Sequence, residues 1–337
     1  MRIGNNPHKN KILQDNDFKH QIIIPIYIPN AEGYFKDGLK ILQYCLGSLF
    51  KTIHSKTFVT LINNGSSVEV AAYLDELLAQ KKIHELIHTV NCGKLNAILK
   101  GLSGNNFPLI TIADADVLFL NDWQQETYRV FDAFPKAGAV CPTPSSKSYK
   151  AFTSNIWFEL LFSKSLSCRK VKNPQALQAF ADSIDNANFY NKYHKELYLT
   201  VKNEDTIAVV GGGHFLVTYK NEVFENPKTK FNKYKLGGDC EILDLPVLEK
   251  GLWRLSTHDN YAYHLGNIDE PWMEDVFLSL RQNDFKLTND LKYKKIETSK
   301  LQFYIKYTLF SRFLKNKKIM KKLLMWKGLS KEAVKNY

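Results

Sequence analysis

Apolar residues along the first 270 positions follow two alternating patterns. Short runs rich in β-branched residues, such as QIIIPIYI at 21–28, are typical of strands buried on both faces. Between such runs, apolar residues recur on one helix face, as Leu39, Leu42 and Leu46 do within 36–54. The same patterns predict strands over 57–63, 86–90 and 108–114 and helices over 68–82 and 94–102. This alternation indicates an α/β fold with a mostly parallel sheet flanked by helices.

Polar side chains stand where two of the expected strands end. Asn63 and Asn64 close one strand, and Asp114 and Asp116 follow another. Ligands of parallel sheets collect outside the carboxyl ends of the strands. We therefore expect these four side chains to converge on one cleft.

The two carboxylates in ITIADADVLFL carry the strongest local chemical signal. Two acids on a buried strand are costly unless a cation compensates them. If the strand ends near Asp114, both acids can face one cleft and share a divalent ion, and oxygen ligands suit Mg²⁺ or Mn²⁺. Such an ion can neutralise a departing diphosphate. The alternative is structural: Asp116 caps the turn and Asp114 contacts the backbone.

The chain changes character after about residue 270, where it becomes basic, aromatic and helix-prone. Residues 281–337 hold sixteen Lys and Arg against four Asp and Glu, which accounts for the whole net charge of +12. We expect an N-terminal extension over 1–19, one catalytic domain over 20–270 and a helical basic C-terminal extension over 271–337. A neutral body with a basic tail indicates a docking surface and argues against a nucleic-acid partner.

The basic tail combines aromatic residues at helical spacing with cations. Phe303, Tyr307, Phe310 and Leu314 fall on one face, and seven cations without an acid lie within 312–327. This pattern suits a helix that lies on an anionic membrane surface. A helix packed on the catalytic domain, or a dimer contact, is the alternative.

Composition restricts the class of protein further. No apolar run approaches the ~20 residues that span a bilayer, and the first twenty residues lack the apolar core of a signal peptide. The five cysteines are scattered singly, which fits a reducing compartment. We expect a cytoplasmic protein at the inner face of the cytoplasmic membrane.

Six segments, from about His20 to Asn267, resemble the inverting family 2 glycosyltransferases of GT-A fold, a Rossmann-like architecture. In chain order they are IIIPIYIPNAEGY, LINNGSS, NCGKLNAILKGL, IADADVLF, GGGHFLVTY and GGDCEILDLPVLEKGLW. The resemblance implies a metal-dependent enzyme that uses Mn²⁺ or Mg²⁺. Its donor would be a nucleoside diphosphate sugar, with UDP-sugars first and dTDP-sugars or others as alternatives. The implied acceptor is a cell-surface glycan or a lipid-linked hydroxyl.

The resemblance also assigns roles to single residues. Asp239 falls on the position of the catalytic base, although it could instead cap the following helix. The metal would be held by Asp116, Asp114 and His264, with His258 as a substitute for the histidine. The acceptor would contact Glu241, His214 and Trp157. The donor would be bound by Pro25, Tyr27, Glu32, Asn63, Asn64, Lys94, Asp114, Ala115, Asp116, Gly212 and Gly213.

Two departures from the family pattern bear on these roles. Asn63 stands where the family often has an Asp that reads the nucleobase, so the choice of nucleotide stays open. Gly238 replaces the acid that often precedes the base. Two other functions also remain: a nucleotidyltransferase of related fold, and a basic protein that binds membrane or nucleic acid without catalysis.

Overall fold

The computed structural model describes residues 4, 9, 11–12, 17–225, 231–288 and 290–337. Most of the expected N-terminal extension over 1–19 lies outside these residues. Ten strands form the main sheet: β1 (His20–Ile26), β2 (Thr57–Asn64), β3 (Glu85–Thr89), β4 (Leu109–Ala113), β6 (Ala137–Cys141), β7 (Ser167–Lys170), β8 (Leu197–Asn203), β9 (Thr206–Val210), β10 (Leu216–Lys220) and β11 (Trp253–Thr257). Their spatial order is β3-β2-β1-β4-β10-β6-β11-β9-β8-β7.

The sheet is mixed, so the expectation of a mostly parallel sheet is wrong for the molecule as a whole. The four strands β3, β2, β1 and β4 are parallel to their neighbours. Beyond them, β10 runs antiparallel to both β4 and β6, and β7, β8 and β9 are joined as antiparallel neighbours. β11 is parallel to β6 and antiparallel to β9, so antiparallel pairs outnumber parallel ones outside the first four strands.

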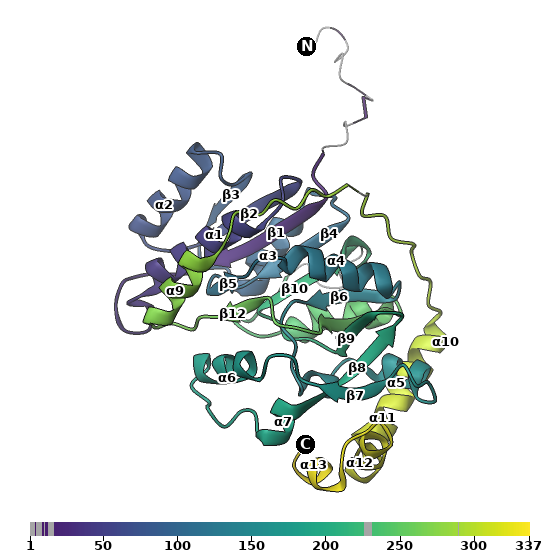
Figure 1. Cartoon of the computed structure of the whole chain (residues 1–337). Helices are drawn as coiled ribbons and strands as arrows, with labels where there is room; N and C mark the ends of the chain where they lie inside the picture. The colour runs from purple at the N-terminus through teal and green to yellow at the C-terminus, as the bar shows by residue number, and fades with distance from the viewer. Residues whose placement is uncertain (1–3, 5–8, 10, 13–16, 226–230, 289) are drawn as a thin grey trace.

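Helices cover both faces of the parallel part (Figure 1). Ile22, Ile24 and Ile26 of β1 pack against α1 (Gly38–Thr52) and α2 (Val68–Ala79). Ile23 points to the other face, against α3 (Lys94–Leu102). Side chains of a strand alternate between faces, so a strand covered twice must be apolar throughout. The run at 22–26 is therefore apolar throughout because helices cover both faces of β1.

The remaining helices of the domain are α4 (Trp123–Ala133), α5 (Ser154–Leu160), α6 (Pro174–Ser183), α7 (Lys192–Glu196), α8 (Leu245–Glu249) and α9 (Pro271–Ser279). Of these, α9 packs on α1 beside the parallel half of the sheet, where Met273 and Phe277 share an apolar cluster with Ile41 and Tyr44 (Figure 1). A two-stranded sheet of β5 (Val117–Phe119) and β12 (Ala262–His264) lies beside the main one. Its antiparallel register places His264 opposite Val117 and therefore next to Asp116.

The basic C-terminal segment returns to the body of the protein. It forms α10 (Lys300–Phe303), the π-helical η5 (Tyr304–Leu309), α11 (Phe310–Lys315), α12 (Lys317–Trp326) and α13 (Lys331–Asn336). Leu314, Leu324 and Val334 are buried in the same apolar cluster as Trp157 and Leu255. No helix among the described residues is long and apolar enough to cross a membrane.

Candidate active site

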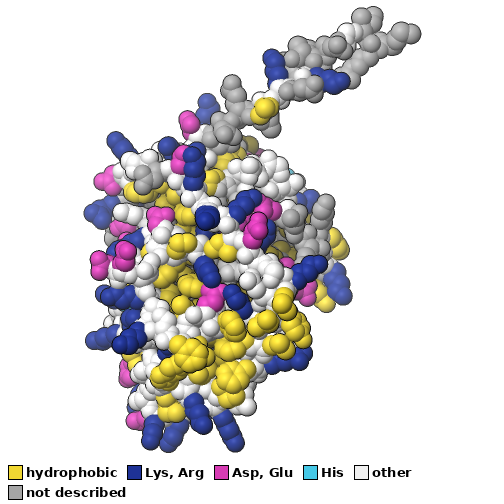
Figure 2. Space-filling view, turned by 90° about the vertical axis from the view of Figure 1, so that its right-hand side faces the viewer, with side chains coloured by type: hydrophobic (Ala, Val, Ile, Leu, Met, Phe, Trp, Pro, Cys, Tyr) yellow, Lys and Arg dark blue, Asp and Glu magenta, His cyan; other side chains and the backbone are white. Residues whose placement is uncertain are grey.

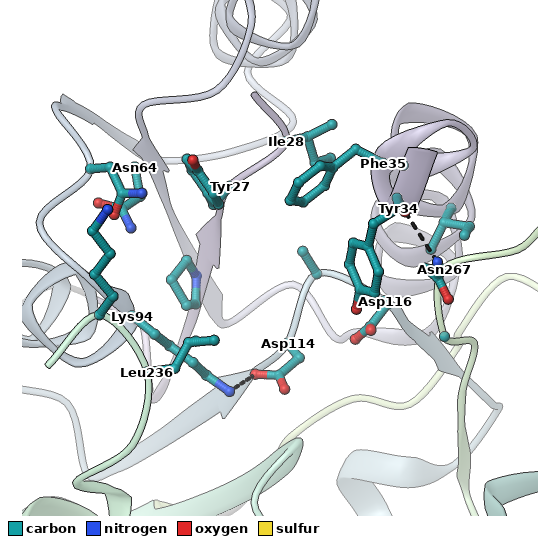
Figure 3. A pocket seen from close by; sticks show the side chains of 17 residues that line it. Tyr27, Ile28, Tyr34, Phe35, Asn64, Lys94, Asp114, Asp116, Leu236 and Asn267 are labelled. Atoms are coloured by element: carbon teal, nitrogen blue, oxygen red, sulfur yellow. Dashed lines mark hydrogen bonds and ion pairs between the residues drawn. The ribbon is translucent and has the colours of Figure 1, made fainter. Parts of the chain in front are cut away.

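A pocket with a volume of about 470 Å³ opens at the carboxyl ends of β1, β2 and β4. Seven residues expected to bind the donor line it: Pro25, Tyr27, Asn64, Lys94, Asp114, Ala115 and Asp116. Figure 3 shows Tyr27 and Phe35 in the upper part of the pocket, Lys94 and Asp114 in its lower part, and Asp116 below Tyr34. The convergence expected from strand ends is therefore present for Asn64 and for both aspartates.

The two aspartates lie in the short turn between β4 and β5. The backbone of this turn is fixed at both ends, because the Asp114 N–H donates to the Phe215 carbonyl and the Asp116 carbonyl accepts from Leu265, each at 2.8 Å. These bonds tie the turn to the segments after β9 and β12. Both carboxylates are consequently held at the pocket by tertiary contacts.

Lys94 supplies the positive charge in this pocket. Its Nζ lies 2.5 Å from Asp114 Oδ1 (Figure 3). Burial disfavours the charged amine, but the negative charges of Asp114, Asp239 and Asp116 outweigh it and raise the pKa of Lys94. Lys94 therefore remains a cation.

Asp116 lies against a histidine. Burial raises the pKa of Asp116, and the nearby charge of Asp114 adds to the rise while His264 opposes it. His264 Nε2 is 3.4 Å from Asp116 Oδ2. Asp116 Oδ1 is buried and accepts no hydrogen bond from the described residues. A carboxylate oxygen in this state has unused capacity for a cation.

The contact that Nδ1, the other ring nitrogen, makes with Ser183 fixes the orientation of His264. Nδ1 lies 2.9 Å from Ser183 Oγ, and that hydroxyl donates to the Phe180 carbonyl at 2.8 Å. Since the hydroxyl hydrogen is used there, Ser183 accepts from Nδ1–H. In this assigned tautomer the lone pair of Nε2 faces Asp116, the arrangement of a histidine that ligates a metal.

In the described part of the chain, no three or more His, Cys, Asp or Glu side chains are arranged so that they could hold a metal ion. Asp116 and His264 are together, but Asp114 is turned to Lys94. The three expected ligands thus do not form a closed set, and His264 contacts Asp116 without lining the pocket.

Asp239 precedes the π-helical turn η4 (Cys240–Asp244). Its side chain makes no capping hydrogen bond, so the alternative role as a helix cap has no support. Oδ1 is buried and has no hydrogen-bond partner among the described residues, and its charge acts on Lys94. Asp239 therefore acts on the charge of Lys94, although it is not among the residues that line the pocket.

Other expected donor residues lie outside this pocket. Asn63 is buried, and its amide contacts His88 Nδ1 at 3.0 Å and the Ser66 N–H at 2.9 Å. Each end of the amide thus makes one contact within the protein, and Asn63 does not line the pocket. Glu32 is exposed and does not line the pocket.

A second pocket of about 230 Å³ contains the two expected donor glycines, Gly212 and Gly213. It shares no lining residue with the first pocket, although His264, which contacts Asp116, lies in its wall. Aromatic rings dominate its lining: Phe180, Phe189, Tyr190, Phe215 and Tyr263. The glycine run therefore belongs to a separate space next to the aspartates.

The three expected acceptor residues are dispersed. Trp157 is fully buried in the core cluster, so the expectation that it stacks on an acceptor is wrong, because its indole has no exposed face. His214 is partly exposed, and its Nε2 lies 2.6 Å from the buried Asp244, which also pairs with Arg254 at 2.9 Å. Glu241 is exposed on the η4 turn.

Ten further residues line the first pocket without a role assigned from the sequence: Ile28, Tyr34, Phe35, Gly38, Ile41, Asn91, Lys235, Leu236, Gly266 and Asn267. Asn91 stands directly before the CGK segment and could have been found from it. The approach of Lys235 and Leu236 depends on long-range contacts, such as the Lys94 N–H bond to the Lys235 carbonyl at 3.0 Å.

Comparisons with known proteins identify the family of this chain. The model of the family "Glycosyl transferase family 2" matches residues 22–193. The poly-beta-1,6-N-acetyl-D-glucosamine synthase of Staphylococcus epidermidis is 24% identical over 216 residues, which are 63% of this chain and 49% of that protein. The chain thus spans about half the length of this curated relative.

Two solved structures are similar at low sequence identity. The S. aureus TarS fragment in complex with UDP-GlcNAc is 11% identical, with a TM-score of 0.45 over 91% of this chain and 70% of that chain. The mannosyltransferase PcManGT from Pyrobaculum calidifontis in complex with GDP-Man and Mn²⁺ is 15% identical, with a TM-score of 0.40 over 72% of this chain and 55% of that chain. Since the family model covers half of the sequence, the chain belongs to glycosyl transferase family 2, the inverting family that its motifs resemble.

Proposed function

We propose that this chain transfers a sugar from a nucleoside diphosphate sugar to an acceptor hydroxyl, with inversion at the anomeric carbon. One observation carries the proposal: the 470 Å³ pocket joins an aromatic wall to a cluster of Lys94, Asp114 and Asp116. A nucleotide sugar has the same division, since its base is flat and apolar on its faces and its diphosphate is charged. A UDP-sugar is the first candidate and a dTDP-sugar the second, from the family resemblance.

The aromatic wall fits a nucleoside. Tyr27 and Phe35 meet edge to face with centroids 5.8 Å apart, and Tyr34 meets Phe35 at 5.1 Å. Tyr27 and Tyr34 are well exposed although they line the pocket. Exposed rings in a concavity offer stacking surface to a base. The nucleoside therefore lies toward β1 and η1 (Gly33–Phe35), and the diphosphate toward Lys94.

A divalent ion fits the residues opposite this wall. Asp116 Oδ1 is buried without a partner among the described residues, and the Nε2 lone pair of His264 faces the same carboxylate. Asp116 and His264 would hold Mn²⁺ or Mg²⁺, with Asp114 as a third ligand once it leaves Lys94. When bound, the ion supplies positive charge that stabilises the diphosphate leaving group.

Asp239 is the proposed catalytic base. It accepts the proton of the acceptor hydroxyl while the hydroxyl oxygen bonds to the anomeric carbon from the face opposite the diphosphate. The bond from that carbon to the phosphate oxygen breaks, and the nucleoside diphosphate leaves with the electron pair. Lys94 stays protonated through this step and offsets the negative charge around it.

The second pocket is the proposed position of the acceptor. Its aromatic lining offers ring faces to a sugar, and Lys147 Nζ lies 4.1 Å from the centre of the Phe189 ring. Gly212 and Gly213 leave its floor free of side chains. His264 stands between this space and Asp116, which places an acceptor beside the donor. A glycan or lipid-linked acceptor is consistent with this space.

We also propose the division into a catalytic domain over 20–270 and a basic extension over 271–337. The extension contributes buried residues to the core, so it stabilises the domain that it follows.

A donor screen tests the proposed function. Purified protein with Mn²⁺ is incubated with a panel of nucleotide sugars, and nucleoside diphosphate release is measured. We expect release with one donor class, its loss in Asp114→Asn, and its retention in the control Asp75→Asn, whose carboxylate is exposed on α2. Pyrophosphate release would instead indicate a nucleotidyltransferase, and no release with any donor would contradict transfer.

A further inference from the structure

The C-terminal helical segment 300–315 is apolar on two faces. Its inner face holds Phe303, Tyr307, Phe310 and Leu314, which pack on the core clusters of the body. These are the residues that the sequence pattern assigned to a membrane, and that assignment is wrong because the domain covers them. The inner face therefore packs on the domain, which is one of the alternatives that the sequence pattern left open.

The outer face of the same segment remains exposed. Leu301, Ile305, Leu309 and Phe313 recur every four residues and are 67%, 37%, 45% and 44% exposed. Residues at this spacing share one helix face, and the π-helical turn η5 keeps them aligned. A helix that is apolar all round needs a second partner besides its own domain.

Aromatic residues on α5, just after it and on α12 extend this face. Phe162 is 86% exposed and meets Trp326, with ring centroids 5.7 Å apart. Phe158 meets Phe310 at 5.2 Å. The outer patch is defined as Phe158, Phe162, Leu301, Tyr304, Ile305, Leu309, Phe313 and Trp326. Figure 2 shows hydrophobic side chains gathered on the lower part of this side of the molecule.

Cations border the outer patch. Lys and Arg side chains stand along the lower edge in Figure 2, and 312–327 contains seven cations and no acid. Beside α11 and α12, a cavity of about 710 Å³ is lined by five lysines, Lys150, Lys315, Lys317, Lys321 and Lys335, and by no acidic residue of the described chain; it is also lined by Tyr307 and Leu314 of the inner face and by no residue of the outer patch. An apolar surface with a cationic border complements an apolar partner with anionic groups at its boundary.

We propose that the outer patch docks on the surface of a bilayer that contains anionic lipids. The apolar and aromatic side chains enter the interface, and the surrounding lysines contact phosphate headgroups. A second copy of the chain fits this surface less well, since a symmetric contact through the patch would bring two lysine clusters together. The docking surface is separate from the proposed active site.

Vesicle sedimentation tests the proposal on the full chain. Vesicles of phosphatidylcholine alone are compared with vesicles in which roughly one third is phosphatidylglycerol. We expect binding to the anionic vesicles, with a blue shift of Trp326 fluorescence that Trp326→Phe removes. Leu301→Ser/Leu309→Ser should weaken binding at least about tenfold, since burial of apolar side chains contributes to interfacial binding. Lys318→Gln/Lys321→Gln/Lys322→Gln should weaken it by about a hundredfold at low salt.

Matched variants control for changes in exposure and charge alone. Leu278→Ser removes a leucine on α9 with the same 67% exposure as Leu301. Lys82→Gln/Lys100→Gln/Lys202→Gln removes three exposed lysines from other elements. Both controls should bind as the unaltered chain does. Equal binding by the patch variants would overturn the proposal, as would failure of the unaltered chain to bind anionic vesicles. Loss of a dimer in the patch variants, seen by sedimentation velocity without lipid, would instead assign the patch to a second copy.

Discussion

At the residue scale, the chemistry of the pocket depends on which charged groups are paired. Lys94 is paired with Asp114, while Asp116 faces His264, and both Asp116 and Asp239 keep a buried oxygen without a partner among the described residues. Buried carboxylate oxygens of this kind are costly unless a ligand, an ion or a proton satisfies them. The two unsatisfied oxygens therefore mark where substrate and metal are expected.

Replacing Asp239 tests the proposed base. Asp239→Asn keeps the shape but removes the proton acceptor, so kcat should fall roughly a hundredfold to ten-thousandfold. The affinity for the nucleoside diphosphate should change little. Steady-state kinetics and calorimetry measure the two quantities. Asp75→Asn, which alters an exposed carboxylate on α2, is the control. An unchanged kcat in Asp239→Asn would exclude it as the base.

Ser183 is a positioning residue for His264. Ser183→Ala removes the acceptor that holds the Nδ1–H tautomer, so Mn²⁺ affinity should fall roughly tenfold to a hundredfold. Titration of Mn²⁺ in the presence of nucleoside diphosphate, followed by electron paramagnetic resonance, measures this change. Ser279→Ala is the matched control, because its hydroxyl also donates to the carbonyl three residues earlier, that of Val276 on α9. Equal affinities in both variants would remove Ser183 from this role.

At the element scale, the pocket depends on how closely the loop before Asp239 approaches α3. Asn96 Nδ2 donates to the Asn232 carbonyl at 2.7 Å, and the Asn232 N–H donates back to Asn96 Oδ1 at 2.8 Å. Gly93, with φ +87°, lies beneath the same loop, and a Cβ there would meet the Tyr234 carbonyl oxygen at 2.8 Å. The loop carries Lys235 and Leu236 into the pocket. A glycine at the start of α3 thus permits one wall of the site.

Substitution of Gly93 tests this contact. Gly93→Ala should displace the loop and raise the KM for the donor several-fold, besides a backbone cost of roughly 1–2 kcal/mol in unfolding free energy. Gly104→Ala is the control: its φ is also positive, at +81°, but nothing lies within 4 Å of the added Cβ. It should lower stability without changing KM. A normal KM in Gly93→Ala would show that the loop tolerates displacement.

At the scale of the whole molecule, a buried polar network joins elements distant in sequence. The Tyr128 hydroxyl of α4 lies 2.6 Å from His20 Nδ1 of β1 and 2.8 Å from His54 Nε2, which follows α1. Burial, with the neighbouring charge of Lys56, lowers the pKa of His54 to about 4. Burial also lowers the pKa of His20, with His54 adding to the effect. Both imidazoles are therefore neutral in the folded protein.

This network predicts a loss of stability in acid. Between the unfolded pKa of about 6.5 and the folded pKa of about 4, the unfolded chain binds protons at His54 that the folded chain does not. The unfolding free energy should thus be constant above that window and fall within it as pH falls, by up to about 1.4 kcal/mol per pH unit for each histidine. Urea unfolding over a pH series measures the slope. His54→Gln should reduce the slope, and an unchanged slope would contradict the assignment.

Local patterns predicted much of the fold and seven of the residues that line the first pocket. The alternation over 21–114 corresponds to β1 through β4 with α1, α2 and α3 between them, because strand and helix periodicities are written in neighbouring residues. Asp114 and Asp116 were found because a pair of acids at the end of a buried strand is visible without tertiary contacts. The antiparallel half of the sheet was not found, since strand direction depends on connections that span many residues.

The sequence by itself determined the α/β alternation, the position of the aspartates at a strand end and the concentration of positive charge in the C-terminal segment. These properties follow from residue types and short spacings. Tertiary structure alone decided that Lys94 pairs with Asp114, that Trp157 lies in the core and that Gly212 and Gly213 face a second pocket. It also decided which face of 300–315 is covered and which stays exposed, because a helix with two apolar faces carries no sign of which one its own domain will bury.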